Sequence, residues 1–175
     1  MPKHQVFIGI GSNIGKRLCH LQEAVDQLAC LEETSLCAVS SIYMTEPIGV
    51  TEQNRFFNGV ILLETELAPE KLRQQCKTIE QELGRPDTYP RWSSRVIDLD
   101  ILLYDNMSLH TETLLIPHPE LHRRKFVLVP LLDIANPVHP VMRLNIRQLL
   151  ECCDDRSVLI RIKETVEMKK KRTAN

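Results

Sequence analysis

A short apolar run that carries two carboxylates constrains this chain more than any other feature. Residues 95–104, RVIDLDILLY, are typical of a β-strand because valine, isoleucine and leucine dominate them. Asp98 and Asp100 are two residues apart, so in a strand they share one face at a separation of about 6–7 Å. Two like charges among apolar neighbours repel each other and lose hydration unless a cation lies between them. The run therefore predicts a cation site on one face of a largely buried strand.

Magnesium is the cation that this pair suits best. Two oxygen ligands at this spacing match Mg²⁺, which usually takes one or two carboxylates and completes its shell with water and substrate phosphates. The alternative is that Asp98 and Asp100 are solvent-facing acids on an exposed strand face, but the apolar residues on both sides of each acid weigh against it. We therefore predict that Asp98 and Asp100 are metal ligands.

The predicted elements follow one another in the order β-α-β-β-α-β. The strands are expected at residues 5–11, 36–43, 56–64 and 95–104, and the helices at 15–31 and 69–83. This order is that of the split βαβ, or ferredoxin-like, arrangement, an α+β fold with a largely antiparallel sheet and both helices on one face. The C-terminal additions are a segment at 126–135 that fits a strand or a helix, a helix at 145–153 and an edge strand at 158–163.

Size and charge narrow the class of protein. The chain has 175 residues and a formal net charge of -1, which predicts one domain over residues 1–165 and argues against nucleic-acid or membrane partners. The basic, polar residues 166–175 are expected to be a disordered tail. We find no signal-peptide pattern and no apolar run long enough to span a bilayer, so the expectation is a cytoplasmic protein. We also expect a monomer.

Two cationic segments flank the acid pair. In residues 84–95, GRPDTYPRWSSR, Arg85, Arg91 and Arg95 accompany the only tryptophan. Arginine side chains match phosphate oxygens bidentately, so this segment predicts a polyphosphate site beside the metal; the alternative is an exposed cationic loop. Residues 116–126, IPHPELHRRKF, form the second cluster, which suggests another phosphate contact, although such a charge run is also typical of a solvated face.

A long polar connection, residues 45–58, precedes the third predicted strand. Loops of this length inside a compact domain are commonly functional. At its end Phe56 and Asn58 alternate onto one strand face, and an aromatic ring beside an amide can stack on a planar heterocycle while bonding to its edge. The alternative is that Phe56 belongs to the core.

Seven segments together carry a family resemblance. They are GIGSNIG, SSIYMTEPIG, FFNGVILLET, IEQELGR, RWSSRVIDLDILLY, IPHPELHRRKFVLVPL and NPVHP. In this order, over about residues 5–150, they resemble the 6-hydroxymethyl-7,8-dihydropterin pyrophosphokinase family of folate biosynthesis. The resemblance implies that the β,γ-pyrophosphoryl group of ATP passes to the pterin hydroxymethyl oxygen with release of AMP. It also implies two Mg²⁺ ions, held between the ATP phosphates and the acid pair.

The same resemblance implies a role for each of a set of residues. The catalytic positions are Arg85, Arg95, Asp98 and Asp100. The ATP-binding positions are Lys77, Glu80, Trp92, Arg95, Ile101, His118 and Arg124. The pterin-binding positions are Thr45, Pro47, Ile48, Phe56, Asn58 and Phe126. Departures from the family pattern at Glu46, Thr113 and Leu115 predict a changed loop conformation and weaker ATP binding, with catalysis retained.

Two other classes of protein share part of this pattern. An Asp-x-Asp pair with a divalent ion also occurs in nucleotide-sugar glycosyltransferases, although these are usually longer and open on a parallel sheet. RNA-binding RRM modules share the β-α-β-β-α-β order, but they need aromatic residues in the central strands and a basic sheet face. Asp98 and Asp100 in the fourth strand, and the net charge of -1, favour the pyrophosphokinase.

Overall fold

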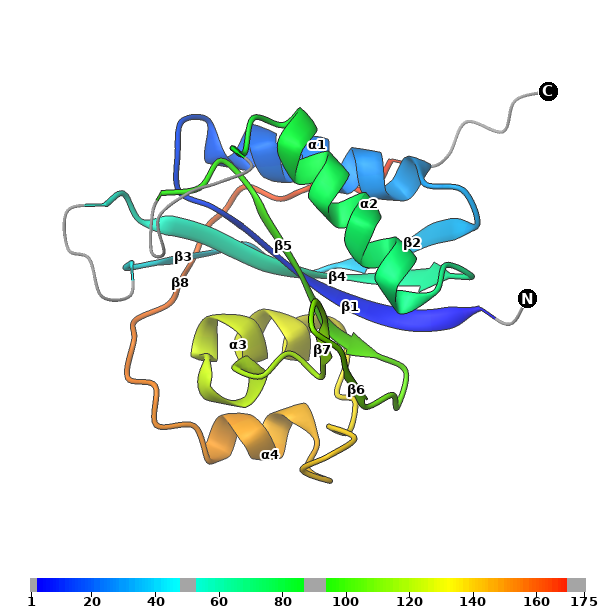
Figure 1. Cartoon of the computed structure of the whole chain (residues 1–175). Helices are drawn as coiled ribbons and strands as arrows, with labels where there is room; N and C mark the ends of the chain where they lie inside the picture. Colours follow the sequence, from blue (N-terminus) through cyan, green and yellow to red (C-terminus); the bar gives the residue numbers. More distant parts are fainter. Residues whose placement is uncertain (1–2, 48–52, 87–93, 170–175) are drawn as a thin grey trace.

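An antiparallel sheet with helices on both faces organises the chain (Figure 1). The structure, a computed structural model, describes residues 3–47, 53–86 and 94–169. The strands of the main sheet are β1 (His4–Ser12), β2 (Thr34–Val39), β3 (Tyr43–Thr45), β4 (Phe56–Thr65), β5 (Asp98–Tyr104) and β8 (Ile160–Arg161). They follow the order β5-β1-β4-β3-β8, and β2 also pairs with β4. This order, with every pairing antiparallel, confirms the ferredoxin-like prediction.

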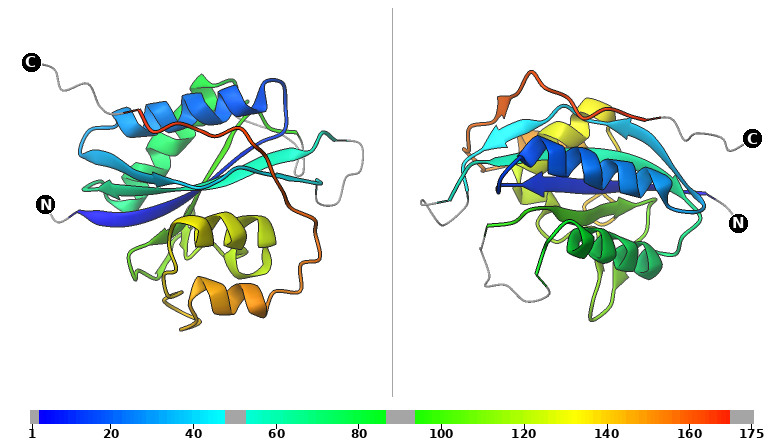
Figure 2. Two further views of the ribbon diagram at one scale, coloured as in Figure 1. Left: turned by 180° about the vertical axis from the view of Figure 1, so that it is seen from behind. Right: turned by 90° about the horizontal axis from the view of Figure 1, so that it is seen from above.

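Helices lie on both faces of the sheet, in different numbers of layers (Figures 1 and 2). One face carries α1 (Arg17–Cys30) and α2 (Pro69–Glu82). The other face carries α3 (Lys125–Ile134), and α4 (Ile146–Glu151) packs on the side of α3 that is turned away from the sheet. Short elements between β5 and α3 are β6 (Leu109–His110), β7 (Leu115–Ile116) and the 3-10 turn η1 (Leu121–Arg123). Within the described part of the chain, no helix combines the length and apolar character that crossing a membrane requires.

The ambiguous segment at 126–135 is the helix α3. Its buried residues Val127, Leu128 and Leu131 follow helical spacing, and they form one apolar face against Phe7 and Val60 of the sheet. A short apolar run does not distinguish strand from helix in sequence. The packing partner decides here, because the second face of the sheet needs a covering layer.

Two hydrophobic cores lie on the opposite faces of the sheet. Beneath α1 and α2, alternate residues of the strands, among them Ile8 of β1 and Ile101 of β5, pack with the helix stripes. Cys76 lies in this core at 1% exposure, as its place on the apolar stripe of α2 predicts. The second core joins α3 and α4 to the other strand face. The side chains that alternate with Ile101 therefore face α3, and this is the face on which Asp98 and Asp100 lie.

Two predicted strand boundaries are wrong. The single strand expected at 36–43 is divided into β2 and β3, because Val39 pairs with Ile61 and Tyr43 with Asn58, which leaves one extra residue on this side of the pairing. At the break, Ser40 remains bonded to Val60: its amide donates to the Val60 carbonyl (2.9 Å), and its Oγ accepts from the Val60 amide (2.9 Å). The strand expected from Arg95 begins at Asp98, since the backbone of Arg95 is instead bonded to Asn13 (3.0 Å). Both breaks lie beside the site described next.

The C-terminal segment, residues 154–169, leaves α4, passes the sheet edge as β8 and ends against α1 (Figure 2). Val166 is buried at 6% exposure, and the Glu167 amide donates a hydrogen bond to Gln22 of α1 (2.7 Å). Lys169 contacts Asp26 on the same helix. Residues 166–169 therefore pack on the domain rather than belonging to a disordered tail, and the rest of the predicted tail, 170–175, lies outside the described residues.

Candidate active site

Glycines in the central strand open a floor beside the acid pair. Strand β1 places Gly9 opposite Asp100 and Gly11 opposite Asp98, and on its other side Gly11 lies opposite Asn58 of β4. Because neither glycine has a side chain, the surface between the acids and Asn58 is hollow. The resulting cavity contains about 930 Å³ of empty space, with the open solvent at its mouth included.

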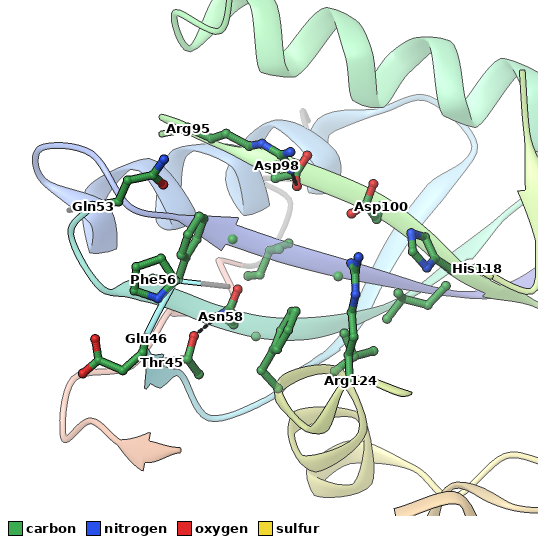
Figure 3. Close-up of a pocket in the computed structure, with 18 residues that line it drawn as sticks. Thr45, Glu46, Gln53, Phe56, Asn58, Arg95, Asp98, Asp100, His118 and Arg124 are labelled. Atoms are coloured by element: carbon green, nitrogen blue, oxygen red, sulfur yellow. Dashed lines mark hydrogen bonds and ion pairs between the residues drawn. The ribbon is translucent and has the colours of Figure 1, made fainter. Parts of the chain in front are cut away.

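The cavity brings together most of the predicted site residues (Figure 3). Its lining includes Thr45, Pro47, Phe56, Asn58, Arg95, Asp98, Asp100, His118, Arg124 and Phe126. Four other predicted residues, Lys77, Glu80, Arg85 and Ile101, are described and do not line it. The remaining two, Ile48 and Trp92, lie outside the described residues.

Asp98 is held by two arginines. One carboxylate oxygen lies 2.6 Å from the Arg85 Nη1, and the other contacts the Arg95 Nη1. Burial by itself raises the pKa of Asp98, but Arg95 and Arg85 outweigh burial and hold the pKa below its usual range. Asp98 is therefore ionised at neutral pH. The two arginines supply part of the positive charge that a pair of neighbouring carboxylates requires.

Asp100 has a different electrostatic environment from Asp98. Burial and the neighbouring Asp98 charge raise the pKa of Asp100 to about 7. A cation bound between the two acids would offset the repulsion between their charges, and carboxylate oxygens are the ligands that Mg²⁺ prefers. Among the residues that the structure describes, no cluster of three or more histidine, cysteine, aspartate or glutamate side chains could enclose a metal. The pair thus fits Mg²⁺, an ion whose remaining ligands are usually water and substrate phosphates.

Behind Asp98, a buried glutamate fixes the position of Arg85. Glu80 of α2 is 1% exposed, and its Oε1 lies 2.6 Å from the Arg85 Nη1 and accepts a hydrogen bond from the Leu99 amide (2.7 Å). Its Oε2 accepts from the Lys77 Nζ at 2.8 Å. Burial raises the pKa of Glu80, while Lys77 and Arg85 oppose the rise. The effect of this chain of charges is to aim the Arg85 guanidinium at Asp98.

On the opposite side of the cavity, the lining includes Asn58 and two aromatic residues. Its Nδ2 donates a hydrogen bond to the Thr45 Oγ1 (2.8 Å), which fixes the orientation of the amide. Phe56 comes from the start of β4 and Phe126 from the first turn of α3, and both line the cavity. An oriented amide near two rings is suited to a flat heterocycle with polar edges.

At a third side, His118 and Arg124 come from the segment between β7 and α3. The His118 amide donates to the Leu102 carbonyl (2.9 Å), and the His118 Nδ1 accepts from the Glu120 amide (3.2 Å). Burial and the Arg124 charge lower the pKa of His118 to about 4. The ring is therefore neutral at physiological pH, with its Nε2 protonated as a hydrogen-bond donor. Arg124 supplies a fixed positive charge beside it.

Sequence reasoning missed several residues that shape the cavity. Gly9 and Gly11 form its floor, and their spacing of two in the first predicted strand is a signal that could have placed them on the face of the acids. Gln53 also lines the cavity, but nothing in the local sequence distinguishes it from other polar loop residues. The Ile101 side chain lies in the core beneath α1 and α2, so the predicted ATP contact of Ile101 stays a prediction for its backbone.

Comparisons with known proteins agree with this geometry. The family model described as "7,8-dihydro-6-hydroxymethylpterin-pyrophosphokinase (HPPK)" matches residues 7–136. A 2-amino-4-hydroxy-6-hydroxymethyldihydropteridine pyrophosphokinase from Bacillus subtilis is 42% identical over 132 residues, which are 75% of this chain and 78% of that protein. The protein of the same name from Haemophilus influenzae is 42% identical over 130 residues, 74% of this chain and 81% of its own.

A solved structure of similar fold is that of Plasmodium falciparum HPPK-DHPS, with a TM-score of 0.67 and 15% sequence identity. The match covers 86% of this chain and 44% of that one. This chain therefore spans less than half the length of the solved protein, and the likeness concerns the fold of the shared part.

Proposed function

The chain belongs to the 7,8-dihydro-6-hydroxymethylpterin-pyrophosphokinase family, and we propose that the cavity bounded by Asp98, Asp100, Asn58 and Phe126 is its active site. The family reaction is the transfer of the pyrophosphoryl group of ATP to hydroxymethyldihydropterin, a step of folate biosynthesis. The observation that carries the proposal is the convergence of an acid pair, the arginines Arg95 and Arg124, and an oriented amide on one cavity.

We propose that Asp98 and Asp100 together would hold two Mg²⁺ ions in this one active site. Magnesium held by these two carboxylates would neutralise part of the charge on the ATP phosphates. Arg95 lines the cavity beside Asp98, so its guanidinium is placed to contact phosphate oxygens as well. Arg85 does not line the cavity; it is held in place by Glu80 and keeps the pKa of Asp98 low, so that Asp98 stays ionised.

We assign His118 and Arg124 to the nucleotide. The neutral His118 ring offers an N–H donor to the cavity, and Arg124 offers a positive charge suited to a phosphate. Lys77 lies at the outer end of the charge chain on α2, with 41% of its side chain exposed. It could therefore reach a nucleotide at the border of the site.

The pterin ring is assigned to the space between Phe56 and Phe126. Asn58 then bonds to the polar edge of the bicycle, while Thr45 keeps the amide oriented. In the reaction, the hydroxymethyl oxygen of the pterin forms a bond to the β-phosphorus of ATP. The bond between that phosphorus and the oxygen bridging to the α-phosphorus breaks, AMP leaves, and the hydroxyl proton passes to solvent. We assign no side chain as general base, since positioning and charge neutralisation supply the main catalytic effects.

Both alternative classes of protein are contradicted. The glycosyltransferase prediction needs a parallel nucleotide-binding sheet, whereas every strand pairing between the described strands is antiparallel. In an RRM module the sheet face that binds RNA is open, whereas here α3 covers this face, and Asp98 and Asp100 line the cavity beside it. Family membership excludes both readings.

The test is an incubation of the purified protein with ATP, MgCl₂ and 6-hydroxymethyl-7,8-dihydropterin, followed by chromatography of the nucleotides. We expect AMP only when all three components are present. ADP as the nucleotide product, or AMP that forms equally without the pterin, would contradict the assignment. Omission of MgCl₂ with added EDTA tests the metal requirement separately.

A further inference from the structure

Asn13, immediately after β1 in the stretch GIGSNIG, has no role in the site described above. Its side chain is completely buried, yet it makes hydrogen bonds to two separate segments of the chain. The Nδ2 donates to the Gln53 Oε1 (3.2 Å) and to the Asn54 carbonyl (3.3 Å). The Oδ1 accepts from the Arg95 amide (2.6 Å), and the Asn13 amide donates to the Arg95 carbonyl (3.0 Å).

The orientation of this amide group is fixed by its partners. The Arg95 N–H can only donate and the Asn54 carbonyl can only accept, so the oxygen of the Asn13 side chain must face Arg95 and its nitrogen must face Asn54. A buried side chain with partners of opposite kind on its two ends resists displacement of either one, because a broken bond leaves a buried polar group unsatisfied.

The two segments belong to opposite halves of the active site. Residues 53–54 lead directly into β4, which carries Phe56 and Asn58 on the pterin side, and Gln53 itself lines the cavity. Arg95 lies on the phosphate side, where its guanidinium contacts Asp98. Asn13 thus joins the backbone that carries the pterin contacts to the backbone that carries a phosphate contact.

We propose that Asn13 is a positioning residue that couples the binding of the two substrates. The inference rests on the proposed function, because it assigns the two segments to the two substrates. When one substrate orders its own segment, the amide of Asn13 holds the other segment in its binding position. The second substrate then meets a site that is already ordered and binds more tightly. By linkage the effect is reciprocal, so either substrate strengthens the other by the same factor.

The experiment measures coupling directly by binding. Fluorescence titration gives the Kd of 6-hydroxymethyl-7,8-dihydropterin in MgCl₂, with and without saturating α,β-methylene-ATP, whose α,β bridge cannot be cleaved. For the unmodified chain we expect the analogue to tighten pterin binding about tenfold. In Asn13→Ala the factor should fall to about one, with each ligand alone losing roughly threefold or less in affinity.

Two further variants separate positioning from loss of stability. Asn13→Asp keeps an acceptor for the Arg95 amide and, as a carboxylate, has no donor for the Asn54 carbonyl, so the folded variant should lose the coupling. Thr34→Val is the matched control, because it removes a buried hydrogen bond to Thr65 (2.7 Å) at the far end of β4. It should lower the urea midpoint and leave the coupling factor unchanged.

The outcomes distinguish this inference from the function on which it rests. Coupling that survives in folded Asn13→Ala or Asn13→Asp, or that is lost equally in Thr34→Val, overturns the role of Asn13. An unmodified chain that binds both ligands without coupling also overturns it and leaves the proposed function standing. A chain that binds neither ligand contradicts the proposed function itself. If Asn13→Ala does not fold, Asn13→Asp decides the question.

Discussion

Substitution of Gly11 by alanine tests whether the floor of the cavity sets the position of the pterin-reading amide. A Cβ atom built on Gly11 lies 3.0 Å from the Asn58 Oδ1, which is tighter than an ordinary van der Waals contact. The backbone of Gly11 does not have the positive φ that favours glycine, so alanine fits the strand itself. The whole conflict therefore falls on Asn58.

The expected loss of pterin affinity follows from the hydrogen-bond geometry that Asn58 loses. To accommodate the methyl group its amide has to move by a few tenths of an ångström, away from the orientation set by its hydrogen bond to Thr45 (2.8 Å). A misaligned hydrogen bond in a desolvated site costs about 1–2 kcal/mol. That free energy corresponds to a pterin Kd that is roughly 5- to 30-fold weaker.

The measurement is the Kd of 6-hydroxymethyl-7,8-dihydropterin and of α,β-methylene-ATP for Gly11→Ala, with a urea unfolding curve for stability. We expect weaker pterin binding, nucleotide binding within about twofold, and a folded protein. The matched control is Gly9→Ala on the same strand face, where the added Cβ meets the Leu102 side chain at an ordinary 3.4 Å. Equal pterin losses in both variants would refute the reasoning, because added volume on the floor, rather than displacement of Asn58, would then explain them.

Three further predictions address other parts of the site. Asp100→Asn should lower turnover by about 100-fold or more. Its urea midpoint at pH 8 should be equal or higher, because the substitution removes the charge repulsion with Asp98. Near-normal AMP formation would exclude the metal role. The lowered pKa of His118, about 4 against an ordinary 6.5, means that the unfolded chain binds the proton more readily than the native protein. His118 should therefore contribute stability that is fully present above about pH 6.5 and is lost, by up to about 3 kcal/mol, as the pH falls through 4. In urea unfolding, His118→Gln should lose less free energy of unfolding on acidification than the unmodified chain. An unchanged pH dependence would contradict this. Phe126→Ala should weaken pterin binding about tenfold with a much smaller effect on the ATP analogue; similar losses for both ligands would count against stacking.

The sequence is sufficient to predict the parts of the site that follow a local pattern. Asp98 and Asp100 share a face because strand side chains alternate, and the apolar stripe of α2 follows from helical spacing. The contacts of Glu80 with Arg85 and the Leu99 amide lie beyond this kind of reasoning. They join the end of α2 to the start of β5 across a loop, and no periodicity relates the two segments.

The boundaries that were wrong share a physical cause. At the first break the Ser40 hydroxyl accepts a hydrogen bond from the Val60 amide, and at the second the Arg95 backbone bonds to Asn13. In both cases a tertiary hydrogen bond outweighs a local strand preference. The helix α3 was undecided for a related reason, since the state of a short apolar run depends on the surface that it covers.

The path of the C-terminal segment affects how the protein can be handled. Strand β8 pairs with Tyr43 and Met44 of β3, so it occupies backbone groups that would otherwise be free to pair with a second molecule. β8 is itself only two residues long, and it offers a neighbouring chain little to extend. A shortened version that ends after Cys153 would uncover the β3 edge and invite self-association. Truncations made for crystallisation or screening should therefore retain the chain through Lys169.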